Sequence, residues 1–228
     1  GLAPYGESKY KQLIYNNLID VKEDGSFELD QSYFNYSSGL TMITNKFNEL
    51  FHQKTRSING EELNQFHMDC AASIQEVTEE IIIKIAKHIK KEYDEENLCL
   101  AGGVALNCVA NGKLQKENIF KDIWVQPAAG DAGGAVGAAL SAWHKEHKQK
   151  RSLYSPDGMK GSLLGPSYSQ KEIEKCLNKV GAKFKVVSVK ELLDETAENL
   201  SVGNAIGWFQ GRMEFGPRAL GNRSILAD

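Results

Sequence analysis

The two segments that decide the fold class are Leu98-Cys-Leu-Ala-Gly-Gly-Val-Ala-Leu-Asn107 and Ile123-Trp-Val-Gln-Pro-Ala-Ala-Gly-Asp-Ala-Gly-Gly134. In each, a short apolar run typical of a buried strand ends in a glycine-rich turn, and a helical pattern follows. This β-loop-α-β-loop-α order predicts an α/β fold with parallel strands and crossover helices. Ligands of such sheets bind at the carboxyl ends of the strands, where both glycine turns fall. The predicted elements are strands at 98–101 and 123–126 and helices at 104–117 and 132–147.

The longest periodic segment runs from Phe66 to Tyr93 and predicts a helix, because its apolar residues recur every three or four positions. Asp69 is expected to cap the start of this helix with its carboxylate. We interpret the apolar face as core packing without chemistry. The members of this face are Cys70, Ile74, Val77, Ile81, Ile85 and Ile89.

Weaker signals complete the α/β pattern. Asp24-Gly25 between alternating segments predicts a hairpin within 17–30, and a short helix is expected near 45–52. A charged connection at 144–161 is followed by a second α/β rhythm. That second part is predicted to contain helices at 170–180 and 190–200 and strands at 184–189 and 205–210.

The change of rhythm indicates two domains. We expect a first domain over residues 1–150, a linker over 151–162 and the beginning of a second domain over 163–228. The chain begins without Met and stops at Asp228 with no closing element, which we interpret as a cut through a longer protein.

The composition of the 228 residues is that of an ordinary globular chain, with 41% hydrophobic and 25% charged residues. A net charge of −3 provides no overall basic field to attract nucleic acid. No apolar run approaches the roughly 20 residues of a membrane span, and no signal peptide is visible. Cys70, Cys99 and Cys108 lie in apolar or Ala-rich settings that favour buried, reduced thiols and a cytoplasmic location.

Three groups of residues are candidates for chemistry, and the first is Gly102-Gly103 with Asn107. Glycines between a strand and a helix expose backbone N–H groups at a helix N-terminus, which suits a phosphate. Asn107 can add a side-chain hydrogen bond to a ribose or a phosphate. The segment is neither a P-loop nor a GxGxxG motif, so a purely structural turn stays open as the alternative.

The second group surrounds Asp131, at the start of the helix that follows the second strand. Small neighbours, Gly130 and Gly134 among them, allow close approach of a ligand. Asp131 could bind a metal, or position Mg²⁺ on a phosphate, through a hard oxygen ligand. The alternative is that Asp131 is only the N-cap of the helix. Its place in a second glycine turn at the same predicted sheet edge favours the functional interpretation.

The third group is the segment 211–228, in which Arg212, Arg218 and Arg223 lie among three glycines and a proline. Guanidinium groups are suited to planar, bidentate capture of phosphate or carboxylate. Gln210 and Glu214 could orient the arginines. The alternative interpretation is a surface turn with solvated charges.

Taken together, these segments resemble the O-carbamoyltransferase family, which includes the nodulation carbamoyltransferases and antibiotic-tailoring enzymes acting on cephamycin and tobramycin. The first part also resembles the tRNA threonylcarbamoyl transferase, which shares the actin/hexokinase-type, RNase H-like fold. The matching segments are 1–6, 101–114, 130–139, 164–166 and 207–228.

The resemblance implies a fold and a two-step reaction. Residues 1–150 would form one lobe of an actin-like domain, and 163–228 would begin an α/β domain that makes carbamoyl-adenylate. In that second domain, carbamoyl phosphate and ATP would first give carbamoyl-adenylate and pyrophosphate. The carbamoyl group would then pass, in the actin-like domain, to a hydroxyl of a sugar or another small metabolite.

The resemblance also assigns roles to residues. Asp131 would be the metal-ligating aspartate, with Fe²⁺ the expected metal and Mg²⁺ an alternative that accompanies ATP. Arg212 would contact carbamoyl phosphate or the adenylate, with Arg218 and Arg223 as further candidates. The residues expected along the nucleotide are Gly102, Gly103, Asn107, Gly130 and Gly134.

Two departures from the family pattern limit what the chain is expected to do. The family's metal-binding HxxxH segment lies in an N-terminal lobe that this sequence does not contain, and most of the second domain is also absent. We therefore expect an internal fragment that is inactive by itself.

Other classes of protein remain as alternatives. An actin-fold sugar or acetate kinase has no need of the arginine segment, and a tRNA-modifying transferase needs a basic face that a net acidic chain does not suggest. A non-catalytic nucleotide-binding module is the third alternative. The expected partners are small molecules, with no nucleic acid and no membrane, and a homodimer is left open.

Overall fold

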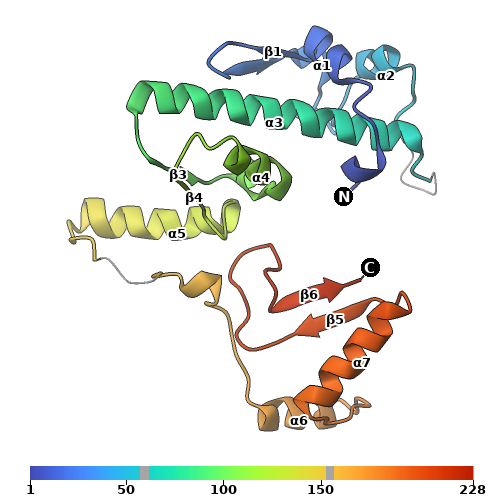
Figure 1. The fold of residues 1–228 in the computed structure, drawn as a ribbon, viewed down its shortest axis with the longest axis vertical. Helices are drawn as coiled ribbons and strands as arrows, with labels where there is room; N and C mark the ends of the chain where they lie inside the picture. Colours follow the sequence, from blue (N-terminus) through green and yellow to red (C-terminus); the bar gives the residue numbers. More distant parts are fainter. Residues whose placement is uncertain (57–61, 153–156, 228) are drawn as a thin grey trace. The chain divides into compact units, whose positions relative to one another are not determined.

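The computed structural model describes residues 1–56, 62–152 and 157–227, in a mixed α/β arrangement (Figure 1). Its contacts divide the chain into two compact units. The first unit contains 1–98 and 107–124, and the second contains 99–106 and 125–228. The linker expected at 151–162 lies partly outside the described residues. Within the described ranges, no helix is both long and apolar enough to cross a bilayer.

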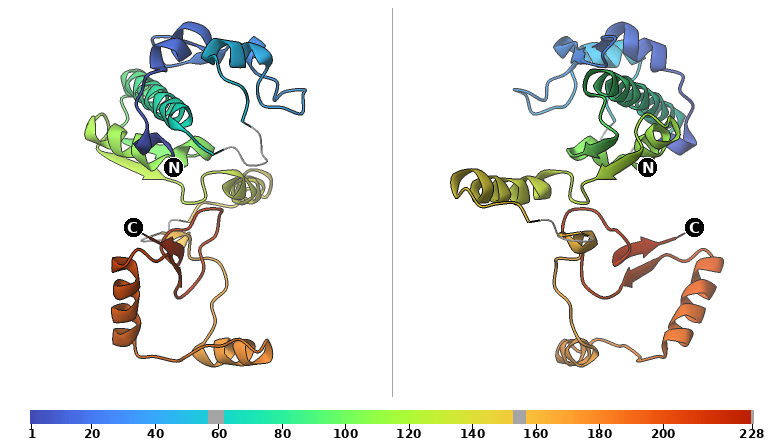
Figure 2. Two further views of the ribbon diagram at one scale, coloured as in Figure 1. Left: turned by 90° about the vertical axis from the view of Figure 1, so that its right-hand side faces the viewer. Right: turned by 60° about the vertical axis from the view of Figure 1, so that its left-hand side comes forward.

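The first unit is built around one long helix, α3 (Gln65–Tyr93). The 3₁₀ turn η1 and the helices α1 and α4 all pack against α3, with α1 and α4 on opposite sides of it (Figures 1 and 2). The other elements of this unit are η1 (Ala3–Tyr5), α1 (Lys11–Asn17), β1 (Ile19–Val21), β2 (Phe27–Leu29), η2 (Gln31–Tyr33), α2 (Asn45–Phe51) and α4 (Cys108–Lys116).

The core of the first unit forms where α3 meets the N-terminal segments. On α3, Val77 is 1% exposed and Ile81 is 6% exposed. The predicted helix is confirmed, but Ile74 of the predicted face is 50% exposed, so the apolar contact covers less of that face than expected. Burial of this kind is the main favourable term in folding. The buried residues of the core are Ile14, Leu18, Ile19, Tyr33, Phe51, Val77 and Ile81.

The start of α3 differs from the prediction. The helix begins at Gln65 with Asn64 as N-cap, and the Asn64 N–H donates to Nδ1 of His67 at 3.1 Å. Asp69 therefore lies inside the helix and does not cap it. A buried position in the first turns still places its negative charge near the positive end of the helix dipole.

Asp69 has a different task, because its carboxylate holds the N-terminal segment on α3. The carboxylate is 3% exposed and accepts hydrogen bonds from the Glu7 N–H (2.9 Å), Lys9 Nζ (3.0 Å) and Gln65 Nε2 (2.8 Å). The bond from the Glu7 backbone, followed by those from Gln65 and Lys9, lowers the pKa of Asp69 to about 2.

The predicted hairpin and short helix are both present. Strands β1 and β2 pair antiparallel with Ile19 opposite Leu29, and α2 lies within the expected range. Gly25 in the hairpin turn has a φ of +86°, and a Cβ there would lie 2.6 Å from the backbone nitrogen of Ile85. Only glycine fits both requirements at this turn.

Strands β3 (Asn97–Leu100) and β4 (Asp122–Val125) pair with each other. The Lys121 N–H donates to the Glu96 carbonyl at 2.8 Å, and the Gln126 N–H donates to the Leu100 carbonyl at 3.0 Å. The partners advance along both strands in the same direction, so the predicted parallel pairing is confirmed.

The helices after these strands begin or end differently from the predictions. The helix expected over 104–117 is a short 3₁₀ turn, η3 (Gly103–Leu106), and then α4, which starts after Asn107. The helix expected over 132–147 is α5 (Asp131–Ser141) followed by a π-helical segment, η4 (Ala142–Glu146). Asn107 interrupts the first helix because it caps α4, its Oδ1 accepting the Ala110 N–H at 3.2 Å.

The second unit ends in two helices and a strand pair (Figure 2). The predicted helices are confirmed as α6 (Gln170–Lys179) and α7 (Val189–Ser201), and the last predicted strand as β5 (Ile206–Phe209). The strand expected at 184–189 is wrong, because that segment has no strand partner among the described residues. Instead β5 pairs antiparallel with β6 (Arg223–Leu226), inside the segment predicted to be a loop.

The cysteine prediction is also partly wrong. Cys99 and Cys108 are exposed, as is Cys176, and only Cys70 is partly buried. All four are free thiols. Burial raises the pKa of the Cys70 thiol to about 11, so this group is an inert part of the α3 packing.

We predict that Ile81→Ala lowers the free energy of unfolding by about 2–5 kcal/mol, because it removes a buried side chain and leaves a cavity. Ile74→Ala is the matched control, since it removes the same atoms from a half-exposed position on the same helix. Urea unfolding of both variants measures the difference. Equal losses would contradict the position of the core described above.

We predict a pH-dependent loss of stability that depends on Asp69. Its pKa is lowered by folding, so its contribution is fully present above about pH 4 and disappears as the pH falls through about 2. The stability difference between the wild type and Asp69→Asn should shrink over that window. The exposed Asp122→Asn serves as control in unfolding curves from pH 2 to 6, and a difference that stays constant with pH would rule out this role for Asp69.

Candidate active site

A pocket of about 650 Å³ in the second unit gathers parts of all three candidate groups. One wall comes from the first glycine turn, a second from the start of α5 and a third from the segment between β5 and β6. The lining residues are Gly103, Leu106, Gly130, Asp131, Ala132, Gly216, Pro217 and Arg218. Four of them, Gly103, Gly130, Asp131 and Arg218, are residues that the sequence predicted for the site.

The two glycine turns are held together by backbone contacts. Gly102 has a φ of +104°, a conformation that favours glycine, and its N–H donates to the Ala129 carbonyl at 2.7 Å. In the first turn of α5, a Cβ at Gly133 would lie 2.1 Å from the Ala128 carbonyl oxygen of the second glycine turn. The turns therefore approach each other as predicted, with Gly103 and Gly130 on the pocket wall.

Asp131 is not an N-cap, so the structural alternative considered for it is wrong. Gly130 occupies the N-cap position of α5, and Asp131 is the first helical residue. Its side chain is exposed and, within the described part of the chain, has no hydrogen-bond or ion-pair partner. The carboxylate is therefore available to a ligand, in the favourable field of a helix N-terminus.

Glu214 organises the segment that carries the arginines. The residue is 2% exposed, and its Oε1 accepts the N–H groups of Leu220 (2.9 Å) and Asn222 (2.7 Å). Arg223 Nε lies 3.5 Å from Oε2. Burial raises the pKa of Glu214, but the backbone N–H groups and the charge of Arg223 outweigh burial, and the net effect lowers it. The sequence prediction that Glu214 orients an arginine is thus supported by a direct contact.

The three arginines do not converge on one point. Arg223 belongs to strand β6, and its Nη2 donates to the carbonyls of Gly216 and Arg218. Arg212 Nη1 donates to the Gly165 carbonyl at 2.6 Å. Both guanidinium groups therefore stabilise the loop itself.

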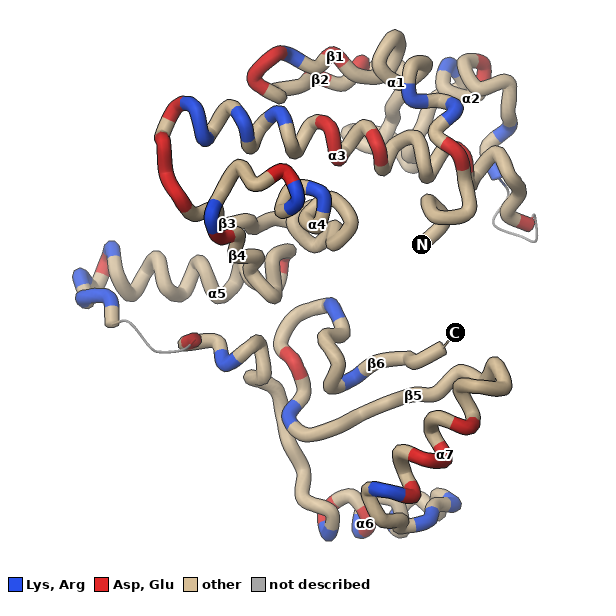
Figure 3. Tube along the Cα trace, viewed as in Figure 1, with Lys and Arg blue, Asp and Glu red and all other residues tan. Residues whose placement is uncertain are grey.

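Arg218 is the arginine that remains for a ligand. Its side chain is exposed and lines the pocket. Across the described residues its guanidinium makes no hydrogen bond or ion pair with the protein. Figure 3 shows that the segment before β6 carries both basic and acidic residues along the trace.

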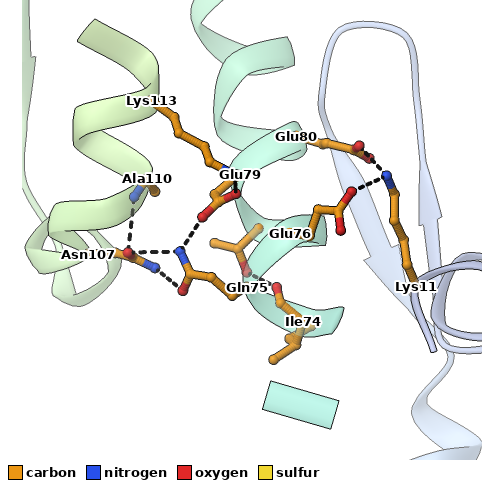
Figure 4. Close-up of polar contacts among 10 residues, drawn as sticks. Lys11, Ile74, Gln75, Glu76, Glu79, Glu80, Asn107, Ala110 and Lys113 are labelled. Carbon is orange, nitrogen blue, oxygen red and sulfur yellow. Dashed lines mark hydrogen bonds and ion pairs between the residues drawn. The ribbon is translucent and has the colours of Figure 1, made fainter. Parts of the chain in front are cut away.

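The remaining candidates lie outside the pocket lining. Gly102 and Gly134 are not among the lining residues. Asn107 belongs to the first unit, where its side chain contacts Gln75 of α3 (Figure 4). No sequence pattern singles out Gln75, because it lies beside the apolar face of a helix that we interpret as packing.

Sequence reasoning also missed part of the pocket wall. Leu106, Ala132, Gly216 and Pro217 also line it. Gly216 has a φ of +107°, and a Cβ there would lie 3.0 Å from the Ala128 Cβ. A glycine and proline next to Arg218 were visible in the sequence, but their approach to the second glycine turn was not.

The metal role of Asp131 stays a prediction. Over the described ranges, there is no group of three or more His, Cys, Asp or Glu residues that could hold a metal ion. One carboxylate does not make a metal site, because protein metals take several ligands. The described residues do not form a complete metal site.

Comparison with known families identifies the class of protein. The model of the carbamoyltransferase N-terminus matches residues 1–140, and that of the carbamoyltransferase C-terminus matches residues 197–228. The chain belongs to the carbamoyltransferase family.

Individual relatives match along the entire chain. The protein sll1178 of Synechocystis sp. (strain ATCC 27184 / PCC 6803 / Kazusa) is 55% identical, and the chain covers 37% of its length. The nodulation protein NolO of Bradyrhizobium diazoefficiens is 37% identical with 39% covered, and the nodulation protein NolNO of Sinorhizobium fredii is 37% identical with 31% covered. The chain thus spans about two fifths or less of the length of these relatives.

We predict that Glu214→Ala destabilises the segment between β5 and β6 by about 1–3 kcal/mol, because it leaves buried N–H groups without an acceptor. Glu198→Ala, on the exposed surface of α7, is the matched control. Thermal unfolding and protease sensitivity at 211–222 measure the effect. Identical curves for the two variants would contradict the organising role of Glu214.

Proposed function

We propose that the complete protein is an ATP-dependent O-carbamoyltransferase. A carbamoyl group moves from carbamoyl phosphate, by way of carbamoyl-adenylate, to a hydroxyl of a sugar or another small metabolite. The observation that carries the proposal is the pocket, in which two glycine turns meet an arginine and an aspartate whose side chains have no partner among the described residues. Membership of the carbamoyltransferase family supports the identity of the transferred group.

The atoms of the first step balance only if phosphate leaves carbamoyl phosphate. Water cleaves the phosphorus–oxygen bond and gives inorganic phosphate and carbamate. A carbamate oxygen then attacks the α-phosphorus of ATP, and pyrophosphate leaves. In the second step the acceptor hydroxyl attacks the carbamoyl carbon and loses its proton, and AMP departs. The first step moves negative charge onto leaving phosphates, which donors and cations stabilise.

The pocket residues have the chemistry that these steps need. The backbone at Gly103 and Gly130 allows close approach of a phosphate, and the N-terminus of α5 favours negative charge there. Arg218 supplies a guanidinium suited to bidentate contact, which no group in the described ranges of the chain occupies. Exclusion of water from the pocket by the bound ligand would limit hydrolysis of carbamoyl-adenylate, which is reactive toward water.

A metal enters the proposal through Asp131 alone. If Fe²⁺ is bound there, or Mg²⁺ with ATP, it would act as a Lewis acid on a carbonyl or phosphate oxygen. The other ligands would have to come from groups beyond those described. We therefore assign to this chain only the contribution of one carboxylate oxygen.

The proposal extends to the domains that carry the reaction, its small-molecule partners and its location. We propose that the first unit and both glycine turns belong to one lobe of an actin/hexokinase-like domain, and that the segment after the linker begins the domain that makes carbamoyl-adenylate. The partners are carbamoyl phosphate, ATP and the hydroxyl acceptor, in the cytoplasm.

We predict that pyrophosphate release from ATP by the complete protein depends strictly on carbamoyl phosphate, and that Arg218→Ala lowers its kcat/KM at least about tenfold. A lost charged contact costs about 1.5–3 kcal/mol, which corresponds to that factor or more. Arg151→Ala removes an exposed arginine outside the pocket and serves as the control.

Each other result of this experiment has its own meaning. ADP formation without carbamoyl phosphate would indicate a kinase. Nucleotide binding without turnover, also with Fe²⁺ added anaerobically, would favour a non-catalytic module. An unchanged rate in Arg218→Ala would remove that arginine from the site while leaving the reaction in place.

A further inference from the structure

The side chain of Asn107, predicted to lie along the nucleotide, is clamped by a second amide from α3 (Figure 4). Asn107 Nδ2 donates to Gln75 Oε1 at 2.9 Å, and Gln75 Nε2 donates to Asn107 Oδ1 at 3.1 Å. The two amides thus form a reciprocal pair, across 32 residues of sequence. The same Asn107 Oδ1 also accepts the Ala110 N–H that begins α4.

A buried carboxylate fixes which end of each amide faces the other. Glu79 lies one helical turn after Gln75 on α3, is 3% exposed, and accepts Gln75 Nε2 at 2.7 Å. An ionised carboxylate can only accept, so it requires the NH₂ end of Gln75. The remaining Gln75 oxygen then requires the NH₂ end of Asn107. Lys113 of α4 pairs with Glu79 and keeps its charge balanced.

The side-chain amide of Asn107 does not use all of its hydrogen-bonding capacity within the described residues. Its oxygen accepts two hydrogen bonds, from Ala110 and from Gln75, and a carbonyl oxygen has two lone pairs. Its Nδ2 carries two hydrogens, of which one goes to Gln75. As far as the described residues go, one N–H therefore remains without a partner, in a partly buried side chain whose orientation is set from two sides.

We propose that Gln75 is a positioning residue that holds Asn107 as a single-donor contact for the nucleotide. The inference rests on the proposed function, since it takes ATP as the ligand. Asn107 then recognises an acceptor atom, such as a ribose or phosphate oxygen, and rejects a donor at that position. Glu79 and Lys113 act one step further away, by fixing the orientation of Gln75.

The arrangement separates positioning from folding. Without Gln75, the Asn107 oxygen still caps α4 through Ala110, so the helix keeps its N-terminal hydrogen bond. What is lost is the restraint on the Nδ2 group, which becomes free to rotate away from the ligand. A preorganised group binds more tightly than a mobile one, because its rotamer freedom has already been given up.

The test is direct ATP binding by the complete protein, measured by equilibrium dialysis or calorimetry. Gln75→Met keeps the length of the side chain and removes its two hydrogen bonds with Asn107 together with the one to Glu79, and should weaken ATP binding by about three- to tenfold. Asn107→Ser keeps a capping oxygen and removes the amide, and should weaken it at least as much. Thr78→Ala on the same helix, whose hydroxyl bonds the Ile74 carbonyl, is the matched control and should bind ATP as the wild type does.

The double variant distinguishes positioning from independent contact. If Gln75 acts through Asn107, Gln75→Met should add no further loss to Asn107→Ser. Glu79→Gln, which admits either end of the Gln75 amide, should also weaken ATP binding. Thermal unfolding of each variant in the absence of ATP separates these effects from a general loss of stability.

The outcomes also separate this inference from the function on which it rests. Additive losses in the double variant, or normal ATP binding by Gln75→Met beside a weakened Asn107→Ser, would overturn the role of Gln75 and leave the proposed reaction standing. Normal binding by Asn107→Ser, with pyrophosphate release still dependent on carbamoyl phosphate, would overturn the inference in the same way. A wild-type protein that binds no ATP would overturn both.

Discussion

Buried polar groups of a helix must find partners, and the described part of α3 carries three of them: Asp69, Ser73 and Glu79. A buried carboxylate without partners is strongly destabilising, so each position selects the segment that packs on it. Asp69 accepts hydrogen bonds from the Glu7 N–H and from Lys9 Nζ, and Ser73 Oγ accepts one from the Tyr10 N–H at 2.9 Å. Glu79 accepts a hydrogen bond from Gln75 Nε2 and forms an ion pair with Lys113. Apolar burial provides the attraction between these elements, and the polar groups fix where they sit.

The second unit uses the same constraint on a smaller scale. There the buried Glu214 collects two backbone N–H groups and Arg223, and so shapes a segment that has little regular structure of its own. Arg212 contributes by holding the Gly165 carbonyl. The charges that shape this loop are thereby occupied. Arg212 and Arg223 could bind an anion by their residue type, but their contacts within the protein occupy their guanidinium groups.

The sequence predicted the elements whose signals are local. The α3 periodicity, the Asp24-Gly25 hairpin and the two strand–glycine turns are confirmed, because spacing and turn chemistry are written within a few residues. The predictions that failed depend on distant partners. Asp69 caps nothing because Glu7 and Lys9 occupy it, and 184–189 has no strand partner although its composition suits one. For the site, composition identified three arginines, but only tertiary contacts distinguish Arg218 from the other two.

The charged residues available in the pocket are therefore those that the rest of the protein does not occupy. Arg212 and Arg223 are bound to backbone carbonyls, whereas Arg218 and Asp131 line one pocket without protein partners in the part of the chain that the structure describes. Opposite charges left unpaired in the same pocket cost little while solvent screens them, and both gain when a ligand excludes that solvent. In the reaction that we propose, a triphosphate would use both, with its oxygens on the guanidinium and a cation it carries near the carboxylate. The other charged side chains of this segment thus hold the loop in its conformation, and Arg218 and Asp131 stay available to a ligand.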